Sequence, residues 1–110
     1  LAALDTGSGE FEVVGKTYKG LTDAEFQNMT DVLLDLALSH QDGTVTVQPG
    51  VVVEVLFNEI QESSQYRSGL ALRFARISRI RDHKGAKDAD TLETLRHLYD
   101  QQFRYKGRLD

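Results

Sequence analysis

Residues 70–81 read LALRFARISRIR, an alternation of apolar and basic side chains that is typical of a β-strand with one buried face. Successive side chains on a strand point to opposite faces. One face, which is expected to meet the core, carries Leu70, Leu72, Phe74, Ser78 and Ile80, and the other carries Arg73, Ala75, Ile77, Arg79 and Arg81. The second face therefore aligns several guanidinium groups along one line.

Arg76 does not fit this alternation, because its position falls in the core phase. A guanidinium group is rarely buried without a charged partner. A β-bulge inserts one residue into a strand, so the side chains that follow it change face. We therefore expect a bulge or bend near Ala75 that lets Arg76 reach solvent.

Positive charge is concentrated around this strand although the chain as a whole is acidic. Residues 66–87 hold seven Lys and Arg against one Asp, a net charge of +6, whereas the 110 residues together carry −4. Charges are screened over about 8 to 10 Å in physiological salt, so a ligand responds to the local excess. Arg suits forked recognition of phosphate oxygens, which predicts an anion-binding strand. The alternative is a solvated strand face that prevents edge pairing, although Lys is the usual residue there.

Apolar periodicity and turn residues place the other elements. Thr22 and Glu25 predict a capping box at the start of the first helix, whose apolar stripe is expected to face a core. The stripe comprises Phe26, Met29, Leu33 and Leu36. A second helix is expected to begin at Asp90, with Glu93 as its box partner. The predicted helices span residues 21–38 and about 90–104, the other predicted strands span residues 1–4, 11–18, 44–48 and 51–57, and a polar loop spans residues 60–69.

The order strand, strand, helix, strand, strand, strand, helix predicts a mainly β fold. Five short strands interrupted by one helix are compatible with a five-stranded OB-fold barrel, with one helix inserted between strands and a C-terminal helix. A split α+β sandwich is the main alternative. No internal repeat or long linker divides residues 1–110, so a single domain is expected.

Composition excludes several classes of protein and site. No apolar run approaches the roughly 20 residues of a membrane span, so no membrane partner is expected. The chain has no Cys, which excludes disulfides, thiolate catalysis and Cys-ligated zinc and fits a reducing compartment. We expect a cytoplasmic protein, associated with the nucleoid if the source is prokaryotic. His40, His83 and His97 are scattered, so no metal site is expected.

Three segments together resemble ATP-dependent DNA ligases, most closely the archaeal and bacterial enzymes. The last conserved element of that family, motif VI, and its trailing helix are similar to SGLALRFARISRIRDHK (68–84) and DADTLETLRHLYDQQ (88–102). The family's segment that enters the barrel helix resembles VGKTYKGLTDAEF (14–26), and its strand and loop before motif VI resemble VVVEVLFNEIQESSQYRSG (51–69). The resemblance covers nearly the whole chain in family order. It implies the C-terminal OB-fold domain of a covalent nucleotidyltransferase.

The resemblance also implies what this chain lacks. In the family the adenylylated lysine lies in a preceding domain, within a K-x-D-G motif that is absent here. The chain also has no initiator Met, so we expect a fragment of a longer ligase that is inactive alone. ATP and Mg²⁺ then belong to the full-length enzyme, and this fragment alone is expected to bind no cofactor stably.

Motif VI of the family ends in R-x-D-K, which the resemblance matches to Arg81, Asp82, His83 and Lys84. Arg81 and Lys84 carry over as the catalytic candidates, and Arg79 joins them as a candidate contact to the β and γ phosphates of ATP. Such groups would orient pyrophosphate as the leaving group and stabilise its growing charge. The family's Asp is His83 here, which puts any role of that carboxylate in doubt.

After nucleotide transfer, the resemblance implies that the domain reorients and grips nicked double-stranded DNA through its backbone, without reading sequence. The candidate DNA contacts are Lys16, Lys19, Arg73 and Arg76. The expected partners are nicked duplex DNA and the adenylylation domain of the same chain, and a monomer is expected. A different hypothesis stays open: a stand-alone OB module that binds single-stranded nucleic acid or a protein partner, without catalysis.

Overall fold

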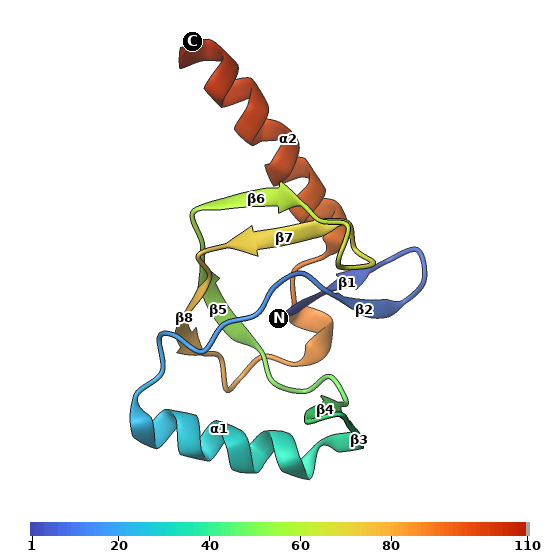
Figure 1. Ribbon diagram of the computed structural model, residues 1–110, viewed down its shortest axis with the longest axis vertical. Helices are drawn as coiled ribbons and strands as arrows, with labels where there is room; N and C mark the ends of the chain where they lie inside the picture. Colours follow the sequence, from blue (N-terminus) through green and yellow to red (C-terminus); the bar gives the residue numbers. More distant parts are fainter. Residues whose placement is uncertain (110) are drawn as a thin grey trace.

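The computed structural model describes the backbone of residues 1–109 and the side chains up to residue 102 (Figure 1). Its strands form four antiparallel pairs: β1 with β2, β3 with β4, β5 with β8, and β6 with β7. In chain order the elements are β1 (Ala2–Asp5), β2 (Glu10–Val13), α1 (Asp23–Asp35), β3 (Ala37–Gln41), β4 (Thr44–Val47), β5 (Val53–Leu56), β6 (Glu59–Glu62), β7 (Leu70–Arg73), β8 (Arg76–Ile80), the short 3-10 helix η1 (Ala86–Asp88) and α2 (Leu92–Leu109).

The predicted mainly β class, with one helix between strands and one C-terminal helix, is confirmed. Within residues 1–109, however, the ladders form two-stranded pairs rather than one closed sheet of five strands. The strand expected over residues 11–18 ends at Val13, and the chain continues beside β7 and β8 without a regular ladder. Single backbone hydrogen bonds join it to them, from Leu72 N–H to the Val14 carbonyl (2.8 Å) and from Ile77 N–H to the Lys19 carbonyl (2.9 Å).

The core lies where α2 meets β1, β6 and β7, in the part of the molecule remote from α1 (Figure 1). Its buried members are Ala3, Val14, Ile60, Leu70, Leu92 and Leu95. The helix that supplies two of them begins at Leu92 and runs to Leu109, beyond the expected end near residue 104. The Thr91 hydroxyl accepts a hydrogen bond from the Thr94 N–H in the first turn of this helix (3.2 Å). Thr91 is therefore the capping residue, and the predicted cap at Asp90 is wrong by one residue.

Helix α1 begins as predicted. Thr22 Oγ1 accepts the Glu25 N–H (3.1 Å) while the Glu25 carboxylate accepts the Thr22 N–H (3.0 Å), which completes the reciprocal capping box. The helix ends at Asp35, earlier than the expected residue 38. Residues 37–41 instead form β3, because Asp42 and Gly43 both adopt positive φ (52° and 77°) and turn the chain back into β4.

The apolar stripe of α1 is only partly covered. Met29, Leu33 and Leu36 are half-buried, but 53% of Phe26 is exposed, and no residue of α1 is fully buried. The expectation that Phe26 belongs to a core is therefore wrong. The helix and the β3–β4 hairpin lie at the end of the molecule opposite α2 (Figure 1), away from the core cluster.

The strand expected over residues 70–81 is divided into β7 and β8, which confirms the predicted bend near Ala75. Phe74 has a positive φ of 56°, an uncommon conformation for a bulky residue. The bend lets Arg76 reach solvent, as predicted. It also leaves Phe74 68% exposed and buries Ala75. Both differ from the prediction, which placed Phe74 on the core face and Ala75 on the outer face. Part of the expected loop at residues 60–69 is also regular, because β6 pairs with β7 and only the segment between them is a loop.

Gly20 is held against the backbone of β8, since Lys19 accepts the Ile77 N–H. Its φ is +104°, and a Cβ at this position would lie 1.9 Å from the Ile77 carbonyl oxygen. Gly20→Ala should therefore lower the free energy of unfolding by about 2 kcal/mol or more. The control Gly43→Ala, at φ +77° with nothing within 4 Å, should cost about 1 kcal/mol from backbone strain alone. Equal losses in urea denaturation would show that the close approach is unimportant.

Candidate functional site

Two predicted site residues meet at the end of β8 on a carboxylate from the neighbouring strand. Glu54 on β5 lies opposite Arg79 in the ladder. Its Oε2 accepts a hydrogen bond from Arg79 Nε and another from Arg81 NH1, both at 3.1 Å. The predicted alignment of guanidinium groups on this face is thus present for Arg79 and Arg81, which converge on one oxygen atom.

These positive charges are partly neutralised by a residue that is distant in the chain. Glu54 is a long-range neighbour that offsets one of the two positive charges, and the hydrogen bond from Arg79, followed by the charges of both arginines, lowers the pKa of its carboxyl. Lys84 lies one turn further along, where its N–H donates to the Arg81 carbonyl (3.1 Å). Its exposed ammonium group has no ion-pair partner in the described part of the chain. This end of β8 therefore keeps an excess of positive charge.

The four predicted DNA contacts lie on two adjoining segments. Lys16 and Lys19 are exposed on the segment that the Lys19–Ile77 hydrogen bond ties to β8. Arg76 begins β8 and is exposed, while Arg73 ends β7 and lies 3.8 Å from Glu59 of β6. The bend thus lies between these two arginines, and Arg76 shares β8 with Arg79 of the Glu54 cluster, which comprises Glu54, Arg79, Arg81 and Lys84.

Two aromatic side chains near the bend are exposed, and the sequence pattern had placed one of them, Phe74, on the core face. The Arg73 guanidinium lies over the ring of Phe74, 5.1 Å from the ring centroid, in a cation–π contact. Tyr18, on the segment beside β8, is 80% exposed. The misfit of Arg76 in the strand alternation was a signal for Phe74, because a bend that frees Arg76 also changes the face of a neighbouring residue.

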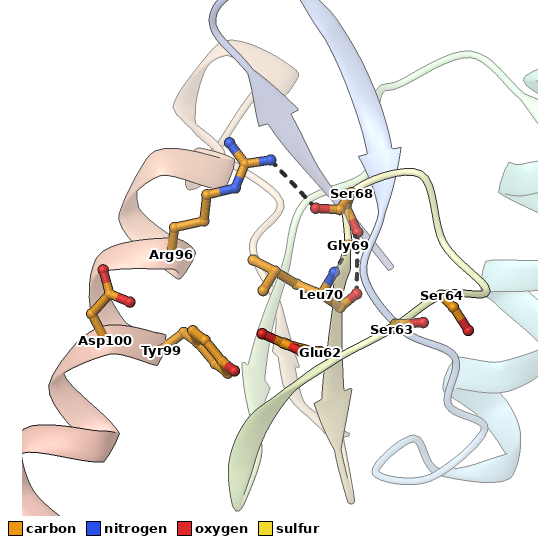
Figure 2. A pocket seen from close by; sticks show the side chains of 9 residues that line it. All are labelled: Glu62, Ser63, Ser64, Ser68, Gly69, Leu70, Arg96, Tyr99 and Asp100. Atoms are coloured by element: carbon orange, nitrogen blue, oxygen red, sulfur yellow. Dashed lines mark hydrogen bonds between the residues drawn. The ribbon is translucent and has the colours of Figure 1, made fainter.

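A shallow cleft of about 710 Å³ lies elsewhere, between α2 and the loop that joins β6 to β7 (Figure 2). Arg96 of α2 donates to the Ser68 carbonyl across it (3.4 Å). Desolvation, and next a hydrogen bond with Glu62, raise the pKa of Tyr99. With Glu62 and Asp100 against the single Arg96, the lining does not favour a phosphate, and none of the predicted site residues contributes to it.

The described residues supply no donor set for a metal ion. Among them, no three His, Asp or Glu side chains lie close enough together to hold one. Neither helix, as far as it is described, combines the length and apolar character needed to cross a lipid bilayer. The guanidinium and ammonium groups of Arg79, Arg81 and Lys84 are suited to binding an anion.

Comparison with protein-family models identifies the family of the chain. Residues 1–84 match the family model described as ATP dependent DNA ligase C terminal region. The chain belongs to this family. The match ends at Lys84, so it includes β5 and β8, which carry the Glu54 cluster, and the bend between β7 and β8. The resemblance inferred from the sequence is therefore confirmed.

Individual relatives of this ligase C-terminal region come from archaea and bacteria. The chain is 55% identical over 104 residues to DNA ligase 1 of Korarchaeum cryptofilum, covering 94% of the chain and 19% of that protein. It is 51% identical over 100 residues to a probable DNA ligase of Mycobacterium marinum, covering 90% of the chain and 20% of that protein. For a DNA ligase of Thermococcus onnurineus the identity is 42% over 108 residues, covering 98% and 19%. The chain thus spans about a fifth of the length of these relatives.

Proposed function

We propose that this region serves ATP-dependent DNA ligation by closing on a nucleotide held by the adenylylation domain of the same protein. Arg81 and Lys84 would then contact the β and γ phosphates of ATP, with Arg79 beside them. Donors placed where charge develops on departing pyrophosphate stabilise the transition state for transfer of the adenylyl group to the enzyme. Mg²⁺ would bind mostly outside this region, because the described residues offer it no carboxylate cluster.

One observation carries this proposal: Arg79 and Arg81 converge on one oxygen of Glu54, and Lys84 follows them without a carboxylate partner in the described part of the chain. A cluster with excess positive charge on a strand end favours a polyanion such as triphosphate. The test compares self-adenylylation with sealing of a pre-adenylylated nick in proteins altered at Arg81 and Lys84.

We further propose that the strand pairs make up an OB-type barrel. The backbone hydrogen bonds from Leu72 to Val14 and from Ile77 to Lys19 support it, because they join the segment after β2 to both β7 and β8. The position of α1, between two sets of strands in the chain, also suits the inserted helix of such a barrel.

The second proposed role is binding of nicked duplex DNA after nucleotide transfer, through a surface made by Lys16, Lys19, Arg73, Phe74 and Arg76. The cations would contact phosphates without reading bases, as sealing at any sequence requires. Phe74 is held exposed at a positive φ beside Arg73, so it could pack against the sugar or base surface exposed in a groove.

Salt dependence separates the charged from the apolar contacts of this surface. Arg76→Ala should weaken binding of the 110-residue chain to nicked duplex DNA and lower the slope of log K against log salt by about 0.9, the contribution of one phosphate contact. Phe74→Ala should also weaken binding but leave the slope unchanged, because no charge is removed. Fluorescence anisotropy over a salt series measures both quantities.

The outcome for single-stranded DNA distinguishes the other candidate role. The exposed rings of Tyr18 and Phe74 could stack on unpaired bases, as in modules that bind single strands. Tighter binding of single strands than of nicked duplex at every salt concentration, with loss on Phe74→Ala, would favour that role over ligation.

A further inference from the structure

Glu54 is placed to organise the two arginines by the register of the β5–β8 pair. Glu54 pairs with Arg79, but Val55 pairs with Ile77, so the ladder is irregular between them. Beyond β8 the pairing continues, because the Arg81 N–H donates to the Val52 carbonyl at 2.8 Å. Arg79 and Arg81 are two residues apart on an extended chain and therefore project to the same side, that of the Glu54 carboxylate.

The contacts leave most of each guanidinium group available. Glu54 engages Nε of Arg79 and NH1 of Arg81, one nitrogen atom of each. Within the described residues neither group has another hydrogen-bond acceptor, so their remaining N–H donors are unoccupied by protein. The side chains of Glu54 and Arg81 are 38% and 27% exposed, which leaves the cluster accessible to a ligand.

Two guanidinium groups close together repel each other, and each free Arg side chain has many rotamers that binding must restrict. A shared carboxylate offsets the repulsion and restricts the rotamers before the ligand arrives. The lowered pKa of Glu54 agrees with this arrangement, because the hydrogen bond from Arg79 and the charges of both arginines stabilise the ionised carboxylate. Such preorganisation increases affinity by reducing the entropy lost on binding.

We propose that Glu54 is a positioning residue, whose carboxylate holds Arg79 and Arg81 in the orientation that receives triphosphate oxygens. This inference rests on the proposed function of the arginines. A competing role would have the opposite effect: if Glu54 blocked the arginines as an internal competitor of phosphate, its removal would strengthen nucleotide use.

The test uses a full-length ligase that carries this region and measures single-turnover self-adenylylation against ATP concentration. Glu54→Gln should lower the second-order rate constant for ATP by about tenfold, the loss expected for a charge-assisted hydrogen bond, and leave sealing of a pre-adenylylated nick unchanged. Glu59→Gln is the matched control, because Glu59 also faces an arginine across a strand pair but at 3.8 Å. It should leave self-adenylylation within about twofold of the parent.

A double-mutant cycle distinguishes positioning from a general structural effect. In the Arg79→Ala, Arg81→Ala background, Glu54→Gln should cause no further loss of self-adenylylation. An equal loss with and without the arginines, or a rate that rises or stays unchanged in Glu54→Gln alone, would overturn the inference. Glu54→Asp, which keeps the charge, provides a second variant if Glu54→Gln folds poorly. Its rate constant for self-adenylylation should fall less than that of Glu54→Ala.

The arginine variants also separate the two proposals. If Arg81→Ala slows self-adenylylation but Glu54→Gln does not, the positioning role fails while the proposed function stands. If neither variant affects self-adenylylation, the proposed function itself fails.

Discussion

Arg81→Ala is expected to slow self-adenylylation of a full-length ligase carrying this region by about 10²- to 10³-fold, the loss typical of removing one transition-state donor. Sealing of a pre-adenylylated nick should change much less, because that step no longer involves the β and γ phosphates. Lys84→Ala should show the same selectivity with a smaller loss, since an exposed point charge contributes less than a fork of N–H groups. Rapid-quench assays of the two steps give both rates.

Two control variants test whether the effect of Arg81→Ala is specific to its site. Lys87→Ala removes a nearby exposed charge that has no proposed role and should leave both steps unchanged. Arg76→Ala, on the proposed DNA surface, should have the reverse profile and impair sealing more than self-adenylylation. Equal losses of both steps in Arg81→Ala would contradict the role assigned to this side chain.

Leu92→Ala is expected to lower the free energy of unfolding by about 3 kcal/mol, because Leu92 is 1% exposed within the core that joins α2 to β1, β6 and β7. Leu98→Ala on the same helix provides the matched control, since Leu98 is 39% exposed and its loss should cost less than about 1 kcal/mol. Urea denaturation of the 110-residue chain measures both. Similar losses would contradict the assignment of the core to the first turns of α2.

Local signals in the sequence predicted several local features correctly, although the cap of α2 is Thr91 rather than Asp90. The Thr22–Glu25 capping box depends on residues three apart, and it occurs as expected. The misfit of Arg76 in the alternation predicted the bend between β7 and β8. The faces on either side of that bend were wrong, because counting alternate positions assumes a regular strand and the positive φ of Phe74 breaks the count.

Features that depend on pairing between distant segments were not predictable in this way. Residues 37 and 38 continue the apolar pattern of α1, yet they belong to β3, which pairs with β4. Glu54 is 25 residues from Arg79 in the chain, and the pairing of β5 with β8 brings its carboxylate to both arginines. The family resemblance pointed to the basic side chains but not to the acidic side chain that holds two of them.

The reverse of self-adenylylation tests most directly whether this cluster contacts the phosphates that leave as pyrophosphate. The adenylylated enzyme reacts with pyrophosphate to regenerate ATP, and its rate is measured against pyrophosphate concentration. Arg81→Ala should raise the concentration needed for half-maximal rate by about tenfold or more, because a charge-assisted contact to pyrophosphate is lost. An unchanged half-maximal concentration in Arg81→Ala, Lys84→Ala and the double variant would contradict the contact.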